Sequence, residues 1–135
     1  MIRLRLITAV AVVALACAMA SCGTSSSDEA KSAVQGYLDA FAKGDGKKAC
    51  DLMTDLTRQQ FVTRVKLLAR TTDCAKAVTA LKPVMAVALK GSKVNQVRVV
   101  GNDASATVRA GKRESTTVLH KENGKWKVTA GPGTQ

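Results

Sequence analysis

Four cysteines are the residues of this 135-residue chain whose type and spacing offer the most chemistry: Cys17, Cys22, Cys50 and Cys74. A thiol can be acylated, bind a metal, form a disulfide or act as a nucleophile. The first two cysteines lie in or directly after an apolar N-terminal segment, whereas the other two lie in the more polar remainder. The two pairs therefore predict different chemistry.

Residues 1–21 have the layout of a secretory signal peptide. Arg3 and Arg5 form a positive start, an almost unbroken apolar run follows, and small residues precede Cys22. The run is too short for an ordinary membrane-spanning helix, which needs about 20 apolar residues. A retained membrane anchor or a buried helix is the alternative interpretation of this segment.

The sequence MASC at residues 19–22 resembles the bacterial lipobox, in which an apolar residue and two small ones precede the cysteine that receives a diacylglycerol. Met19 stands where leucine is usual, and a frame that ends at Cys17 competes. We favour Cys22 because the apolar run continues beyond Cys17 and a polar Ser/Thr segment follows. Residues 22–27 are then a flexible tether. Lipid chains such as palmitate would hold the protein at the extracytoplasmic face of the bacterial cell membrane. Secretion without lipid is the alternative.

Once Cys17 leaves with the signal peptide and Cys22 carries lipid, Cys50 and Cys74 remain. An oxidising envelope compartment favours a disulfide between them. In the chain-entropy model, closing a loop of about 25 residues contributes roughly 3 to 3.5 kcal/mol. A metal site lacks the usual four ligands, because only His120 could join the two thiols. Redox chemistry lacks a C-x-x-C spacing. We therefore expect no metal and no other cofactor.

The remaining ionisable residues give little support for catalysis. His120, the single histidine, shares a strand face with Glu114, which lies too far along the strand to orient it. Asp51 and Asp55 are four residues apart on one helix face, and the two lysines before them are typical of a solvated surface. Residues 44–46 (GDG) lack the Lys-Ser/Thr context of a phosphate loop. The sequence predicts no catalytic residues and a protein that is not an enzyme.

Five large apolar residues are candidates for lining a pocket: Tyr37, Phe41, Met53, Phe61 and Trp126. Such side chains would present an apolar wall to a small ligand. Ordinary core packing is the alternative for all five.

The chain carries 21 Lys and Arg against 10 Asp and Glu, a formal charge of +11. Without the two arginines of the signal peptide, 19 basic residues (21 less two) and a charge of +9 remain. Proteins that bind single-stranded nucleic acid stack bases on several surface aromatic residues. One Trp, one Tyr and two Phe are too few to form both a core and such a surface. No nucleic acid is expected; the basic second half of the chain instead favours an anionic leaflet or envelope polymer.

The spacing of apolar residues predicts the helices that position these groups. Ser26 and Glu29 fit a capping box, and three- and four-residue spacing predicts a helix that ends near Gly44. Further helical patterns cover residues 45–56, about 61–70 and a stretch that opens at Cys74. Pro83 is expected to break or kink the last of these helices.

After Gly91 the apolar period becomes two, which predicts strands. The expected strands are 94–100, 104–110, 114–121 and 126–130. Asn123-Gly124 between the last two is a strong hairpin signal. Helices followed by strands predict one α+β domain over residues 28–131, with the N-terminal helices packed on a curved four-stranded antiparallel sheet.

Residues 33–53 (AVQGYLDAFAKGDGKKACDLM) resemble the opening of small actinobacterial lipoproteins with a nuclear-transport-factor-2-like domain of unknown function. That family has a Tyr-Leu-x-Ala helix, then Gly-Asp, then a helix that begins Ala-Cys. The matching positions here are Tyr37, Leu38, Ala40, Gly44, Asp45, Ala49 and Cys50. Residues 122–128 (ENGKWKV) resemble the family's final hairpin. The resemblance covers residues 28–130 and implies a cystatin-like cone, a sheet wrapped around the first helix with a pocket at its wide end.

These patterns together predict an exported, lipid-anchored protein of the cell envelope. The expected function is that of a non-enzymatic module that binds an envelope protein or an anionic envelope component. The alternative is a carrier that holds a small apolar ligand, such as a lipid, in the cone pocket. Fold alone does not decide between them.

Overall fold

The structure is a computed structural model and describes residues 24–130. Four helices precede four strands: α1 (Ser26–Lys43), α2 (Gly46–Asp51), α3 (Asp55–Ala69), α4 (Cys74–Ala88), β1 (Lys93–Val100), β2 (Asp103–Ala110), β3 (Arg113–Glu122) and β4 (Lys125–Ala130). The helices pack against a four-stranded sheet, which confirms the expected α+β class. The expected signal peptide and Cys22 lie outside the described residues.

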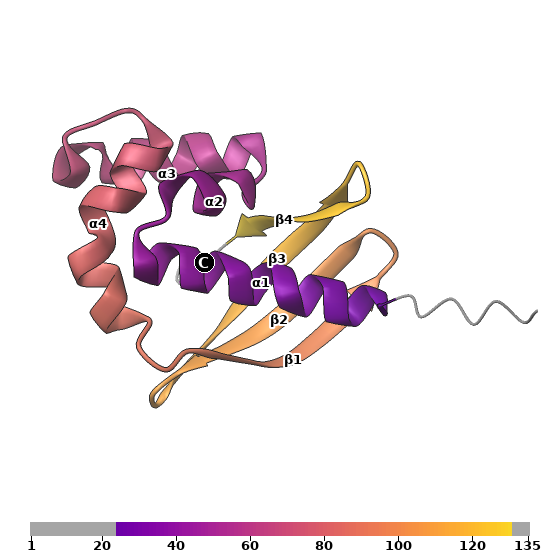
Figure 1. The fold of residues 1–135 in the computed structure, drawn as a ribbon. Helices are drawn as coiled ribbons and strands as arrows, with labels where there is room; N and C mark the ends of the chain where they lie inside the picture. The colour runs from indigo at the N-terminus through magenta and orange to yellow at the C-terminus, as the bar shows by residue number, and fades with distance from the viewer. Residues whose placement is uncertain (1–23, 131–135) are drawn as a thin grey trace, which may run out of the picture.

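The strands form one open antiparallel sheet in the order β1-β2-β3-β4, so each strand pairs with its neighbour in sequence. Their bounds match the expected ranges within one residue. Asn123 and Gly124 connect β3 to β4 with φ of 50° and 76°. Positive φ at both positions is what a type I′ hairpin turn requires. Figure 1 shows α1 lying across one face of the sheet.

Helix α1 begins where a serine side chain can cap it. The Ser25 hydroxyl accepts a hydrogen bond from the Asp28 N–H at 3.1 Å, and Asp28 and Glu29 place negative charge in the first turn. The expected cap at Ser26 is therefore wrong by one residue, and the helix includes Ser26 and the next residue of the expected tether. Because consecutive serines are equivalent as caps, their sequence alone does not select one.

The segment between α2 and α3 corrects the expected helix over residues 45–56. Helix α2 ends at Asp51, and the chain then runs beside β4: the Val128 N–H donates to the Leu52 carbonyl and the Thr54 N–H donates to the Val128 carbonyl, at 2.7 and 3.1 Å. An edge strand otherwise leaves such groups unpaired. Thr54 then caps α3, which begins at Asp55 rather than near residue 61.

Helix α4 begins at Cys74 as expected, and the Asp73 side chain caps it. The helix continues through Pro83 to Ala88, so the chain does not break there. Proline removes one intrahelical hydrogen bond. Pro83 is exposed, which lets water hydrate the carbonyl that loses its donor.

Helices α2 and α4 approach each other at Gly46 and are joined covalently one turn later. A Cβ built on this buried glycine would lie 2.1 Å from the Ala75 carbonyl oxygen. The Cys50–Cys74 disulfide links the same two helices, with Cα atoms 6.2 Å apart. The expected disulfide is thereby confirmed.

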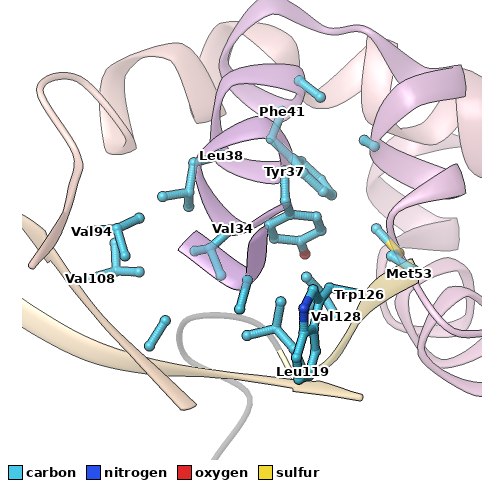
Figure 2. Close-up of a cluster of buried hydrophobic side chains, with 14 of the residues drawn as sticks. Val34, Tyr37, Leu38, Phe41, Met53, Val94, Val108, Leu119, Trp126 and Val128 are labelled. Atoms are coloured by element: carbon cyan, nitrogen blue, oxygen red, sulfur yellow. The ribbon is translucent and has the colours of Figure 1, made fainter. Parts of the chain in front are cut away.

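The core lies between α1 and the inner face of the sheet (Figure 2). Side chains of α1 point from above toward alternate residues of the strands. The labelled members are Val34, Tyr37, Leu38 and Phe41 from α1, Met53, Val94, Val108, Leu119, Trp126 and Val128. Side chains on the other face of the sheet alternate with these and are mostly polar. The alternation accounts for why the strands were predictable.

Candidate ligand-binding site

A cavity of about 480 Å³ opens where α1 and α4 meet the ends of β2 and β3. Its wall consists of Tyr37, Leu38, Phe41, Met85, Ala88, Leu89, Ala110, Arg113, Glu114 and Ser115. Figure 1 shows the last turn of α4 and the β2–β3 turn at one end of the molecule. The larger apolar side chains come from α1 and the end of α4, whereas Arg113, Glu114 and Ser115 come from the start of β3. The cavity therefore has an apolar wall and a polar rim.

Two of the five expected pocket residues, Tyr37 and Phe41, line this cavity. Their rings pack edge to face with centroids 4.8 Å apart. Phe61 of α3 packs against the ring of Phe41 at 5.4 Å, so it supports the cavity wall without reaching the cavity. Met53 is buried beside the strand β4, and Trp126 is buried within that strand. The expected set is thus divided between one cavity and the core.

The rest of the lining was not expected from the sequence. Met85 and Ala88 lie in the last turn of α4, Leu89 caps it, and Ala110 ends β2. Each fits an ordinary apolar position of its own element. The only available signal was the run of apolar residues in α4 beyond Pro83, because the meeting of α4 with the β2–β3 turn is a tertiary contact.

Tyr37 gives the cavity a neutral phenol. Burial raises its pKa from 10.0 to about 12, because a phenolate in this apolar surrounding would lose its hydration. Tyr37 is therefore uncharged at neutral pH and can donate a hydrogen bond. It cannot serve as a base there.

Titration of Tyr37 tests its burial directly, because it is the single tyrosine of the chain. We expect tyrosinate absorbance to appear near pH 12 in the folded protein and near pH 10 in urea. Since the unfolded chain releases this proton first, the free energy of unfolding should fall as the pH rises from about 10 to about 12. Tyr37→Phe should remove that part of the fall. A folded-state midpoint near 10 would show that the phenol is exposed.

His120 has a carboxylate partner that the sequence did not reveal. Its Nδ1 lies 2.7 Å from Asp103 Oδ1 across the β2–β3 pair. The sequence argument compared His120 only with Glu114 on its own strand. Both partners are exposed, with side chains 44% and 73% accessible, and they lie on the outer face of the sheet, away from the cavity. The pair is separate from the candidate site.

Asp51 and Asp55 are surface residues, each paired within its own helix. The Lys47 ammonium donates to Asp51 at 2.7 Å. This hydrogen bond lowers the pKa of Asp51 and raises the pKa of Lys47. Arg58 pairs with Asp55 at 2.5 Å. Their charges are thus already compensated.

These pairs border a second, more open hollow of about 710 Å³ beside the disulfide. Its lining is mixed and charged: Lys47, Cys50, Asp51, Arg58, Gln59, Val62, Thr63, Thr72, Asp73, Cys74 and Ala75. A ligand there would compete with ion pairs that the helices already form. The smaller apolar cavity is the better candidate for a binding site.

Within residues 24–130 we find neither a cluster of metal-ligating side chains nor a membrane-spanning helix. No three His, Cys, Asp or Glu side chains of that range gather as a ligand set. None of the helices in that range combines the length and the apolar character that crossing a bilayer requires.

In comparisons with known proteins, no family model, curated protein or solved structure matches this chain.

Proposed function

We propose that this chain is an exported, lipid-anchored protein of the bacterial cell envelope that binds a small, largely apolar ligand without chemical turnover. The signal-peptide layout of residues 1–21 and the lipobox-like residues that end at Cys22 support export and anchoring. The resemblance to nuclear-transport-factor-2-like lipoproteins over residues 28–130 supports a cystatin-like cone, and the α+β arrangement agrees with it.

The cavity at the end of α1 and α4 is the observation that carries this proposal. Its volume of about 480 Å³ falls within the range of about 300–1,000 Å³ typical of small-molecule sites. Its largest side chains are apolar, and its phenol is neutral. Such a wall can exclude water from an apolar ligand. Between the two functions expected from the sequence, the cavity favours the carrier.

Filling the cavity should abolish binding. Ala88 lines it from the exposed last turn of α4, so Ala88→Trp would place an indole in the cavity and leave the core residues unchanged. We expect calorimetry with 1-decanol to give at least tenfold weaker binding to this variant. The measurement uses the mature chain, residues 22–135, with Cys22→Ser to keep it free of lipid.

Ala80→Trp is the matched control, because Ala80 is an exposed residue of the same helix outside the cavity lining. It should bind 1-decanol like the unsubstituted chain. Equal binding by the two tryptophan variants would place the ligand elsewhere and contradict the carrier proposal.

Lipid attachment is tested by radiolabelled palmitate in the bacterial host. We expect the full chain to take up the label and Cys22→Ala to lose it, because the lipobox-like residues direct the diacylglycerol to this thiol. Cys17→Ala should keep the label. Loss of the label in Cys17→Ala alone would assign the lipid to the earlier frame.

An envelope-protein partner is the second candidate function. Helix α3 exposes Leu56, Leu67 and Leu68 at 64%, 84% and 77%, and exposed apolar side chains grouped on one element are typical of interaction surfaces. Native mass spectrometry of protein purified from its own envelope separates the two candidates. A bound small molecule supports the carrier, whereas a bound protein without one supports the interaction module.

A further inference from the structure

Basic residues gather around the mouth of the cavity. Arg113 lines it directly. Lys112 lies in the turn between β2 and β3, and Lys90 directly follows Leu89, which lines the cavity. Lys93 pairs in register with Arg109 near the end of β2. All of these residues are exposed. The cavity therefore has an apolar interior, and basic side chains surround its mouth.

Glu114 is the single carboxylate of the cavity lining, and Arg109 neutralises it. The Arg109 guanidinium donates to Glu114 at 3.3 Å between paired positions of β2 and β3. Among the described residues, Arg113 forms no ion pair. Arg113 is therefore available to an anion from outside the chain.

The two ends of α1 differ in their surface charge. At the other end of α1, Asp28 and Glu29 occupy the first turn, and Glu29 pairs with Lys121 at 3.0 Å. The nearby β1–β2 turn is followed by Asp103, and β3 ends at Glu122. Basic and acidic residues are thus mixed there, whereas at the mouth basic residues prevail.

We propose that the ligand is an anionic amphiphile: a single apolar chain that lies in the cavity and a carboxylate or phosphate head group that lies at the mouth beside Arg113. This inference rests on the proposed carrier function and specifies its ligand. Tyr37, Leu38 and Met85 contact the chain, and the cations around the mouth attract the head group. An exposed ion pair contributes about 0.2–1 kcal/mol, so the apolar chain supplies most of the affinity and the head group supplies selectivity.

The test compares three probes of equal chain length: decanoate, 1-decanol and decyltrimethylammonium. We expect decanoate to bind the mature chain about three- to tenfold more tightly than decyltrimethylammonium at low salt, with 1-decanol between them. The preference should shrink when salt is added, because the Debye length falls to about 8 Å at physiological ionic strength.

Arg113→Gln locates the head group. We expect this variant to bind decanoate about threefold more weakly and 1-decanol unchanged. Arg98→Gln is the matched control, because Arg98 is an exposed arginine of β1 outside the cavity lining. This substitution lowers the net charge by the same amount as Arg113→Gln. It should bind decanoate like the unsubstituted chain.

The outcomes separate this inference from the proposed function. Equal affinities for the three probes, or equal losses in the two arginine variants, would overturn the anionic ligand and leave an apolar carrier. Absence of binding by all three probes would overturn both. Tighter binding of decyltrimethylammonium would assign the head group the opposite charge.

Discussion

Cys50→Ser with Cys74→Ser is expected to lower the free energy of unfolding by about 3 kcal/mol. The disulfide closes a loop between residues separated by 24 positions, and the chain-entropy model assigns roughly 3 to 3.5 kcal/mol to a loop of this size. Helix α2 has only six residues, too few to be stable alone, so it depends on its link to α4. Urea unfolding followed by circular dichroism measures the loss.

Reduction of the unsubstituted protein provides the control. The protein in dithiothreitol should unfold at the same urea concentration as the double-serine variant, because both lack the covalent link. For a domain of about 100 residues, a loss of this size lowers the melting temperature by more than about 10 °C. A midpoint that does not respond to reduction would mean that the reduced chain keeps α2 on α4 unaided.

Gly46→Ala is expected to have an effect of similar size through a different cause. The added Cβ would lie 2.1 Å from the Ala75 carbonyl oxygen and 2.6 Å from the Ala75 carbonyl carbon. These are backbone atoms of α4, which cannot rotate aside as a side chain can. Helices α2 and α4 must separate, and such overpacking costs about 3 kcal/mol. Urea unfolding of the oxidised variant measures it.

Gly36→Ala is the matched control for this substitution. A Cβ at Gly36 would meet Leu52 Cδ1 at 3.6 Å and the Lys48 side chain at 3.7 Å, both ordinary contacts. Because Gly36 lies inside α1, alanine should stabilise the protein by about 0.5–1 kcal/mol. Opposite signs for the two variants support the close approach of α2 to α4. A neutral Gly46→Ala variant would contradict it.

The strands were predictable because one physical rule governs them. The side chains of each strand alternate between the core and solvent, and glycine or asparagine marks each turn. The alternating pattern and the turn residues therefore predict the same strand boundaries. The start of α1 was predictable only to within one residue, since Ser25 and Ser26 have the same capping chemistry. The disulfide was predicted from the number of cysteines left once Cys17 and Cys22 were assigned to the expected signal peptide and lipid anchor, rather than from any geometry.

The break between α2 and α3 was not predictable, because its cause, the pairing with Val128, lies about 75 residues away in the chain. Residues 51–56 continue a helical pattern in the sequence. In the structure, however, the edge strand β4 forms hydrogen bonds with the backbone groups of Leu52 and Thr54. The partner of His120 was missed for the same reason. A residue's neighbours along a strand can be read from the sequence, whereas its cross-strand partner depends on register.

Only a small part of the candidate site was predictable. Tyr37 and Phe41 belong to a strongly periodic helix, so their inward orientation followed from spacing. Whether inward-facing side chains of a helix pack into the core or line a cavity depends on the element that packs against them. Here the end of α4 and the ends of β2 and β3 meet α1 without filling the space between them, and the resulting cavity has no signature in the residues that border it.

The two ends of α1 define a direction for the whole domain. Eighteen residues of helix span about 27 Å, with the cavity near the end of the helix opposite its cap. The cap, Ser25, follows Cys22, the proposed anchor, by three positions in the sequence. Between Cys22 and Ser25 the chain can extend no more than about 10 Å. With Cys22 anchored and α1 upright, the mouth opens more than two Debye lengths above the tethering leaflet, where the charge of its lipids is largely screened. A domain anchored in this way would direct its cationic mouth, and any ligand bound there, away from the membrane.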